Sequence, residues 1–154
     1  MITEAAVWAH AGASLMMAGL LWFVQIVHYP LFARAAGDAE GWKAYESEHQ
    51  SRTTLVVGPL MLVEAATALL LLVLRPEGVD LALLIASVVL VGVVWALTFF
   101  FAVPLHARLS GGFDAAVHRS LVAVNWPRTI AWTARSAVSL LIVRQFLVAS
   151  HGAM

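Results

Sequence analysis

The hydrophobic positions of the chain fall into four long blocks that charged residues rarely interrupt. Residues 5–33 and 81–107 contain no Asp, Glu, Lys or Arg, and residues 53–74 contain only Glu64. A fourth block, from about residue 126 to residue 148, carries Arg135 in its middle and Arg144 near its end. Each block is longer than the roughly 20 residues that a helix needs to cross the hydrocarbon of a bilayer. The pattern predicts an all-α polytopic membrane protein with a bundle of four transmembrane helices.

We expect a single transmembrane domain, residues 1–154, with helices at about 4–33, 52–75, 79–107 and 127–148. The segments at about 38–50 and 113–124 are predicted to be amphipathic and to lie on the membrane surface. In the first, Trp42 and Tyr45 recur at helical spacing, and in the second Val117 and Leu121 do so. Asn125 is the expected N-cap at which the last helix restarts, because a proline follows in its first turn.

Composition removes several classes of protein. Hydrophobic residues make up 62% of the chain and charged residues 12%, with nine acidic and nine basic side chains and no cysteine. This excludes a disordered chain, a disulfide-stapled module and a nucleic-acid binder with a basic face, so no nucleic-acid partner is expected. It also excludes a thiolate nucleophile and any Cys-ligated metal site. Membrane lipid is the expected surrounding.

Basic residues near the ends of the predicted helices set the expected orientation. Six lie in or beside the first and third loops, and only two mark the other side: Arg34, Lys43, Arg52, Arg108, Arg119 and Arg128 against Arg75 and Arg144. Loops rich in Lys and Arg stay in the cytoplasm. We therefore expect both long loops to be cytoplasmic and both termini to lie outside.

The two halves of the chain resemble each other. Pro30-Leu31-Phe32-Ala33-Arg34 matches Pro104-Leu105-His106-Ala107-Arg108 at an offset of 74 residues, and Arg52-Thr53 matches Arg128-Thr129 at an offset of 76. Two duplicated helical hairpins, related by an axis along the membrane normal, would produce this pattern. Chance similarity between short motifs in a biased composition is the alternative.

Two ionisable residues lie at matched depth inside predicted spans. Glu64 follows Thr53 by 11 residues, about 16 Å along a helix, and Arg135 follows Asn125 by 10 residues, about 15 Å. Opposite charges at the same depth predict an ion pair, since neither tolerates lipid alone. The pair is either a structural clamp between helices or a group that handles substrate or protons.

Polar side chains also follow one stripe of the last helix. Asn125, Arg128, Trp132 and Arg135 are spaced by three, four and three residues, so they share a helix face. Two guanidinium groups, an amide and an indole on one stripe predict a pocket for an anionic or aromatic ligand, open to the cytoplasm.

Histidines gather on the predicted cytoplasmic side. His28, His49 and His106 are candidate metal ligands, and Glu46 stands three residues before His49, a spacing that places two ligands on one helix face. The alternative is that these histidines are only polar groups near water. No cofactor is identified from the sequence, and a metal or a haem stays open.

Short motifs across the chain resemble a large group of small bacterial four-helix membrane proteins that is loosely similar to the anthrone-oxygenase-like family. These motifs are Gln25-x-x-His28-Tyr29-Pro30, Arg52-Thr53, Pro104-x-His106 and Asn125-x-x-Arg128-Thr129. The resemblance implies oxygen chemistry on a reduced polycyclic phenol, with His28, Asn125 and Arg128 at the corresponding positions. It also implies the inner (cytoplasmic) membrane of a bacterium.

The leading hypothesis is an oxidoreductase or oxygenase-like enzyme that acts on a lipophilic aromatic or quinone-like substrate. A base such as His28 would take a phenolic proton while an arginine stabilises the phenolate. The expected catalytic residues are His28, Glu64 and Arg135, and the expected substrate-binding residues are Gln25, Tyr29, Asn125, Arg128 and Trp132. The alternatives are a non-catalytic subunit of a larger membrane complex and a small proton-coupled transporter. We also expect self-association, because four short helices enclose little space.

Overall fold

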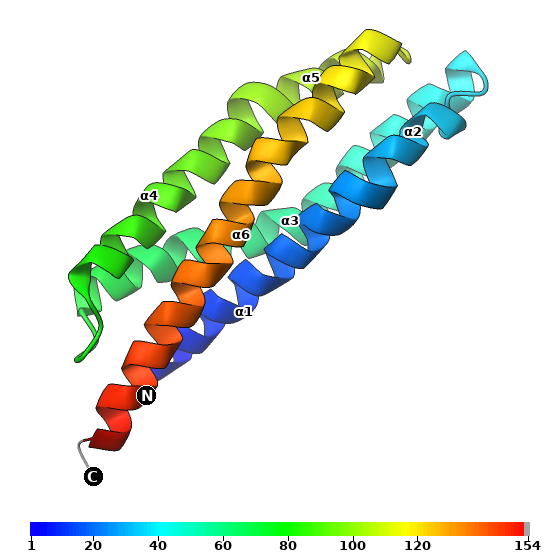
Figure 1. The fold of residues 1–154 in the computed structure, drawn as a ribbon. Coiled ribbons are helices and arrows are strands. Elements are labelled where there is room, and N and C mark those ends of the chain that lie inside the picture. The colour runs from blue at the N-terminus through cyan, green and yellow to red at the C-terminus, as the bar shows by residue number, and fades with distance from the viewer. Residues whose placement is uncertain (153–154) are drawn as a thin grey trace.

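The computed structural model describes residues 1–152 and shows four long helical rods joined by short turns (Figure 1). The first rod consists of α1 (Ile2–Phe23), the π-helical turn η1 (Val24–His28) and α2 (Tyr29–Ala35). The second rod is α3 (Ala39–Leu74). The third consists of α4 (Leu81–Leu97), the π-helical turn η2 (Thr98–Ala102) and α5 (Val103–Ser110), and the fourth is α6 (Ala115–Gly152). The predicted all-α helical bundle is confirmed.

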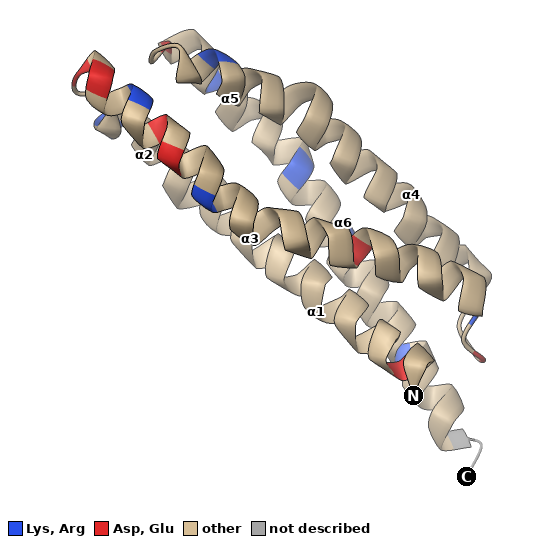
Figure 2. Ribbon diagram, turned by 180° about the vertical axis from the view of Figure 1, so that it is seen from behind, with Lys and Arg blue, Asp and Glu red and all other residues tan. Residues whose placement is uncertain are grey.

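The rods alternate in direction around the bundle. α1 packs against α3 and α6, and α4 packs against the same two helices, so the rods follow one another around the bundle and the first lies beside the last. Both termini lie at one end of the bundle, and α2 and α5 lie at the other (Figure 1). We call the end with α2 and α5 the polar end, because most of the charged residues that are visible in Figure 2 gather there.

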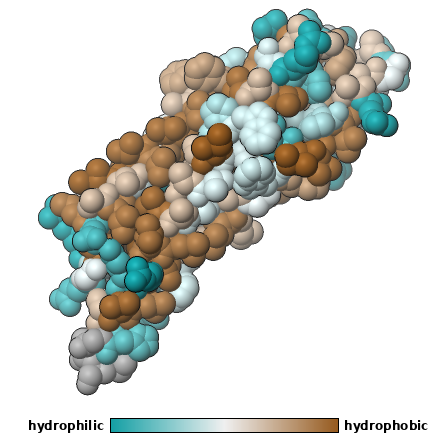
Figure 3. Space-filling model, viewed as in Figure 1, coloured by the Kyte–Doolittle hydropathy of each residue, from teal (hydrophilic) through white to brown (hydrophobic). Residues whose placement is uncertain are grey.

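Three of the rods are long and apolar enough to cross a membrane: Ile2–Ala35, Ala39–Leu74 and Leu81–Ser110. Large apolar side chains cover the outside of the bundle between its hydrophilic ends (Figure 3). A soluble protein rarely exposes a continuous apolar surface of this kind. Length and composition thus support a membrane protein, with α6 as the one long helix that the same criteria leave out.

The two π-helical turns precede the two prolines that open α2 and α5. A proline lacks an N–H, and its ring clashes with the carbonyl four residues earlier. Before each proline one helical turn takes in an extra residue. The N–H of Tyr29 therefore bonds to the carbonyl of Val24, five residues back, and the N–H of Val103 bonds to that of Thr98. Each rod continues through its proline instead of breaking.

The structure corrects the two predicted surface segments. Residues 39–50 are the first turns of α3, and residues 115–124 are the first turns of α6. They continue these rods and do not form separate amphipathic helices. Their apolar faces have a partner within the bundle, because Trp42, Val117 and Leu121 pack with Phe32 and Leu109 in one buried cluster.

Asn125 is also placed differently from the prediction. It lies inside α6, where its side chain bonds to Gln25 and Arg128 and not to amides of a helix start. The cap of this helix is Asp114, whose carboxylate accepts from the backbone N–H of Ala116 at 2.7 Å and of Val117 at 3.1 Å. Hydrogen bonds from Val117 and Ala116 lower the pKa of the exposed Asp114 carboxyl below its usual value.

This cap predicts a pH-dependent contribution to stability. The lowered pKa means that folding favours the ionised carboxylate, so the contribution is complete above the unfolded pKa and is lost as the pH falls through the folded pKa. Asp114→Asn should lower the thermal midpoint in detergent near neutral pH. The difference from the wild type should shrink as the pH falls below the unfolded value, about 4, and should vanish below the folded pKa. Glu77→Gln, on the exposed turn between α3 and α4, is the control. A difference that is independent of pH would contradict the assignment.

Candidate functional site

The predicted ion pair is present in the middle of the bundle. Nε of Arg135 donates to Oε1 of Glu64 at 3.1 Å, and both side chains are 1% exposed. The second carboxylate oxygen, Oε2, accepts from Nε1 of Trp132 at 2.9 Å. The remaining nitrogens of Arg135 donate to the Ser87 carbonyl at 2.9 Å and to the Ser14 hydroxyl at 3.4 Å.

His10, on the same helix as Ser14, extends this network. His10 lies between the hydroxyls of Thr67, at 3.0 Å from Nδ1, and Ser87, at 2.9 Å from Nε2. The Thr67 hydroxyl already donates to the Val63 carbonyl at 2.6 Å, so it accepts from Nδ1–H of His10. All four rods thereby contribute to one buried polar network. Its side chains are satisfied by each other and by backbone carbonyls of the bundle, which is the arrangement of a clamp between helices.

A second polar region lies between this clamp and the polar end, and it contains a cavity of about 290 Å³. Apolar side chains from α1, α3 and η2 form most of its wall, among them Leu20, Met61 and Phe99. Its polar lining includes Tyr29, His49, His106 and Arg128. Neither Glu64 nor Arg135 lines it, so the structure separates these two expected catalytic residues from the cavity.

Arg128 is held at this cavity without a carboxylate partner. It is 6% exposed, and its NH1 group donates to the side-chain oxygen of Asn125 at 3.0 Å. The guanidinium carbon lies 5.6 Å from the ring centre of Trp132. Nε has no hydrogen-bond partner, and no ion pair within residues 1–152 includes Arg128. The positive charge of this buried guanidinium is therefore not compensated by a carboxylate, and an anionic or hydrogen-bond-accepting ligand would stabilise it.

The remaining predicted substrate-binding residues divide between the cavity and its support. Tyr29 lines the cavity. Nδ2 of Asn125 donates to the side-chain oxygen of Gln25 at 3.0 Å, and both amides are buried. This contact fixes Asn125, which in turn holds Arg128. Trp132 connects the two polar regions, since its ring faces Arg128 and its N–H bonds to Glu64.

The histidines predicted to gather do so at the polar end. Nε2 of His28 lies 3.0 Å from Nδ1 of His49, and the rings of His49 and His106 are 5.3 Å apart between centres. His106 bonds through Nδ1 to Glu46 at 2.7 Å and through Nε2 to the Tyr29 hydroxyl at 2.8 Å. Each of the three rings thus already uses at least one nitrogen on another side chain. No group of three His, Asp or Glu side chains within residues 1–152 is arranged to hold a metal ion.

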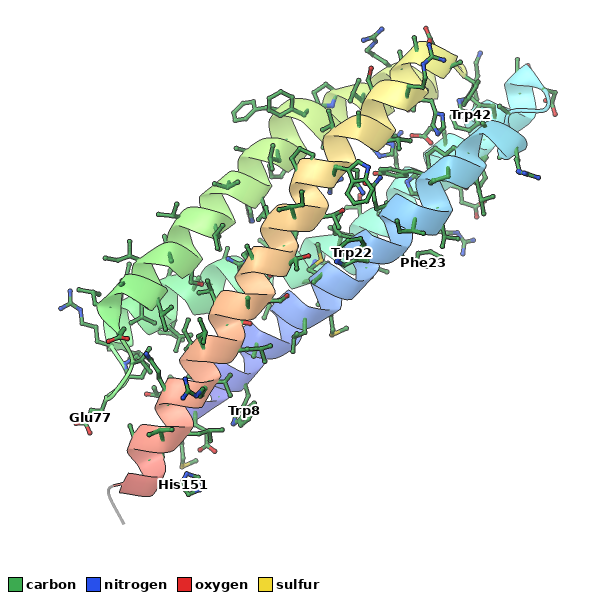
Figure 4. The ribbon with its side chains drawn as sticks, in the orientation of Figure 1. Trp8, Trp22, Phe23, Trp42, Glu77 and His151 are labelled. Atoms are coloured by element: carbon green, nitrogen blue, oxygen red, sulfur yellow. The ribbon has the colours of Figure 1, made fainter. Side chains whose placement is uncertain are left out.

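Phe32 organises this cluster. It is fully buried, and its ring makes edge-on contacts with the rings of His28, Tyr29, Trp42 and His49. Trp42, labelled in Figure 4, anchors the start of α3 because its Nε1 donates to the Leu109 carbonyl of α5 at 2.7 Å. The side chains around the cavity are therefore held by aromatic packing on the side of the polar end.

Sequence reasoning missed Glu46 as a buried group. Its carboxylate is 0% exposed, and Oε1 accepts from His106 and from Gln50, while Oε2 has no hydrogen-bond partner among the residues that the structure describes. Nothing local distinguishes it from its exposed neighbours Glu40 and Glu48. Its spacing of four residues from the buried Trp42 was the available signal, because it places both side chains on one helix face.

Comparisons with models of protein families, with curated proteins and with solved structures found no match for this chain. The geometry of the site therefore carries the functional argument.

The clamp predicts strong coupling between Glu64 and Arg135. Glu64→Gln and Arg135→Leu should each destabilise the protein by about 3–5 kcal/mol, because each leaves a buried charge uncompensated. The double variant should recover part of this loss, measured by unfolding in detergent. The control is the exposed pair Glu48 and Arg52 on one face of α3, for which the coupling should be below about 1 kcal/mol. Additive losses at Glu64 and Arg135 would refute the clamp.

Proposed function

We propose that the protein is a membrane-embedded enzyme of the oxidoreductase or oxygenase-like class that binds a lipophilic aromatic or quinone-like substrate at Arg128. The observation that carries the proposal is the buried guanidinium without a carboxylate partner on a largely apolar cavity. A cation in such surroundings is stabilised by an anion or by strong hydrogen-bond acceptors. An oxygen of the substrate supplies this acceptor.

A phenolic hydroxyl fits the cavity because it enters from lipid as a neutral group and becomes an anion inside. The proposed proton acceptor is His49, which lines the cavity. If Nδ1–H of His49 donates to Nε2 of His28, then Nε2 of His49 keeps a free lone pair. The O–H bond of the phenol breaks, an N–H bond forms at Nε2, and the phenolate stays beside Arg128. General-base transfer of this kind needs a base within hydrogen-bond reach of the proton.

The proposal divides the residues expected from the sequence into two roles. His28 orients His49, and Arg128 stabilises the phenolate, with Asn125 and Gln25 holding Arg128 in place. Glu64 and Arg135 keep the helices together. Oxidation of the electron-rich phenolate by dioxygen is what the family resemblance implies, and it follows the proton transfer.

We further propose that all four rods span the membrane, in the inner membrane of a bacterium with both termini outside. α6 supports this through its outward face. Between Leu121 and Val143 each exposed side chain is uncharged, and the two arginines within this range, Arg128 and Arg135, are buried against other helices. At 1.5 Å per residue these 23 positions extend about 35 Å, enough for the roughly 30 Å of hydrocarbon.

The clamp argues against a purely structural subunit whose buried charges await partner chains. Each nitrogen of Arg135 has an acceptor within this chain, so no outside group is required there. Of the two buried arginines of α6, Arg128 is the one with a nitrogen that lacks an acceptor, and it lines a cavity and not the outside of the bundle.

Binding of a chromogenic phenol tests the proposal. A lipophilic nitrophenol absorbs visible light only as the phenolate, so an absorbance titration in detergent reports its pKa when bound. The wild type should lower that pKa, because Arg128 stabilises the anion. Arg128→Leu should weaken phenolate binding about 10- to 100-fold, the loss expected for a hydrogen bond to a charged group.

The matched control for this experiment is Arg144→Leu, which removes an exposed arginine from the same helix. It should bind the phenolate as the wild type does. Thermal unfolding checks that both variants are folded. Unchanged phenolate binding by Arg128→Leu would overturn the proposal. So would a site that binds a simple alkyl carboxylate and does not bind the phenol.

Orientation is tested by single cysteines, since the chain contains none. Gly37→Cys is suitable because a Cβ at this position meets no atom within 4 Å, whereas a Cβ at Gly41 would lie 2.7 Å from Oδ2 of Asp38. An impermeant maleimide should label Gly37→Cys only from the cytoplasmic side. It should label Glu77→Cys, at the opposite end in Figure 4, only from outside. The reverse pattern would refute the orientation.

A further inference from the structure

An open groove of about 620 Å³ lies on the outside of the bundle between α1 and α3. Its lining changes character along its length. Glu48 and Arg52 form an exposed ion pair at its polar end. Toward the middle of the bundle the lining is apolar, and Phe23 and Val56 are 57% and 52% exposed there. The proton transfer proposed for the cavity at Arg128 involves this groove only through His28 and His49.

The groove and the cavity at Arg128 adjoin each other. Five side chains line both: Leu20, Val24, His49, Thr53 and Val57. His49, the proposed base, is one of them. A single molecule can therefore lie in both spaces, with one part beside Arg128 and another part in the groove.

The size of the inner cavity limits what fits beside Arg128. Its volume of about 290 Å³ is at the lower limit of ligand pockets, which measure roughly 300–1,000 Å³. It accommodates a small ring and little more. A lipophilic substrate with further apolar atoms must place them elsewhere, and the adjoining apolar groove is open to the side of the bundle.

From this continuity we infer that the groove holds the flexible hydrocarbon tail of the molecule whose ring binds at Arg128. The substrate class is then a tailed phenol or quinol, a lipid with a small aromatic head, and not the compact polycyclic phenol that the family resemblance implies. The inference rests on the proposed function and narrows it to this chemistry.

The exposed apolar wall suits a tail that arrives from the bilayer. A hydrocarbon chain gains little by leaving lipid for another apolar surface, so the tail adds little affinity of its own. Its role is to guide the head, because the tail stays at the lipid surface while the ring passes His49 and reaches Arg128. The Glu48–Arg52 pair marks the polar end, where the headgroups of the bilayer would lie.

Blocking the groove tests the inference. Two ligands share one nitrophenol head, and only one of them has a long alkyl tail. Val56→Trp fills the groove, and Val73→Trp places the same bulk on an exposed position of α3 outside it. Val56→Trp should weaken binding of the tailed phenol at least tenfold in nanodiscs, because the ring cannot enter the cavity when its tail has no room in the groove. Binding of the tailless phenol should stay within twofold, and Val73→Trp should change neither.

Unchanged binding of the tailed phenol by Val56→Trp would overturn the inference and leave the proposed function standing. If neither phenol binds the wild type, the proposed function fails and the inference fails with it. A second measurement needs no variant. A tailed phenol with a photoreactive diazirine at the end of its tail should label wild-type peptides that contain Phe23 or Val56, and excess tailless phenol should suppress this labelling. Labelling that persists would mean that ordinary lipid chains occupy the groove.

Discussion

A guanidinium buried among apolar side chains must be supplied with acceptors, and the way in which α6 meets this requirement shapes the molecule. Arg135 obtains a carboxylate, a carbonyl and a hydroxyl from the three other rods, so its charge draws the bundle together. Arg128, two turns earlier, obtains an amide oxygen and an aromatic face but no carboxylate. One helix thus carries a cation that is satisfied and a cation that is not, and Trp132 stands between them.

This difference explains why the polar residues of the interior do not form one site. The network around Glu64 is complete, so it contributes rigidity and leaves little for a ligand to bind. The cavity lies between that rigid layer and the aromatic cluster around Phe32. Both layers hold backbone and side chains in place, which suits a site that must keep a base and a guanidinium at fixed positions.

The sequence alone identifies the ionisable residues that lie inside long apolar blocks, because such residues are rare there. Only a few ionisable residues interrupt the apolar blocks, so Glu64 and Arg135 were recognisable, and their depth alone indicated that they meet. At the polar end charges are common, so the presence of a charge does not reveal that Glu46 is buried, and its spacing from Trp42 is the only indication. The early turns of α3 and α6 were assigned to the membrane surface because amphipathicity does not reveal whether lipid or protein covers the apolar face. The sequence predicts Arg128 on the polar stripe of the last helix, but it does not reveal that Asn125 holds Arg128 and that Gln25, from another rod, holds Asn125.

The π-helical turn η1 couples the clamp to the cavity in a way that hydrophobic periodicity does not show. In the first rod it adds one residue between α1, which carries His10 and Ser14, and α2, which begins with Tyr29. The wide turn takes up this residue locally, because the N–H of Tyr29 bonds five residues back and not four. Removing one of residues 24–28 would restore regular α-helical bonding and press the ring of Pro30 against the carbonyl four residues earlier. The rod would then kink between clamp and cavity, so the extra residue keeps these two regions in one continuous helix.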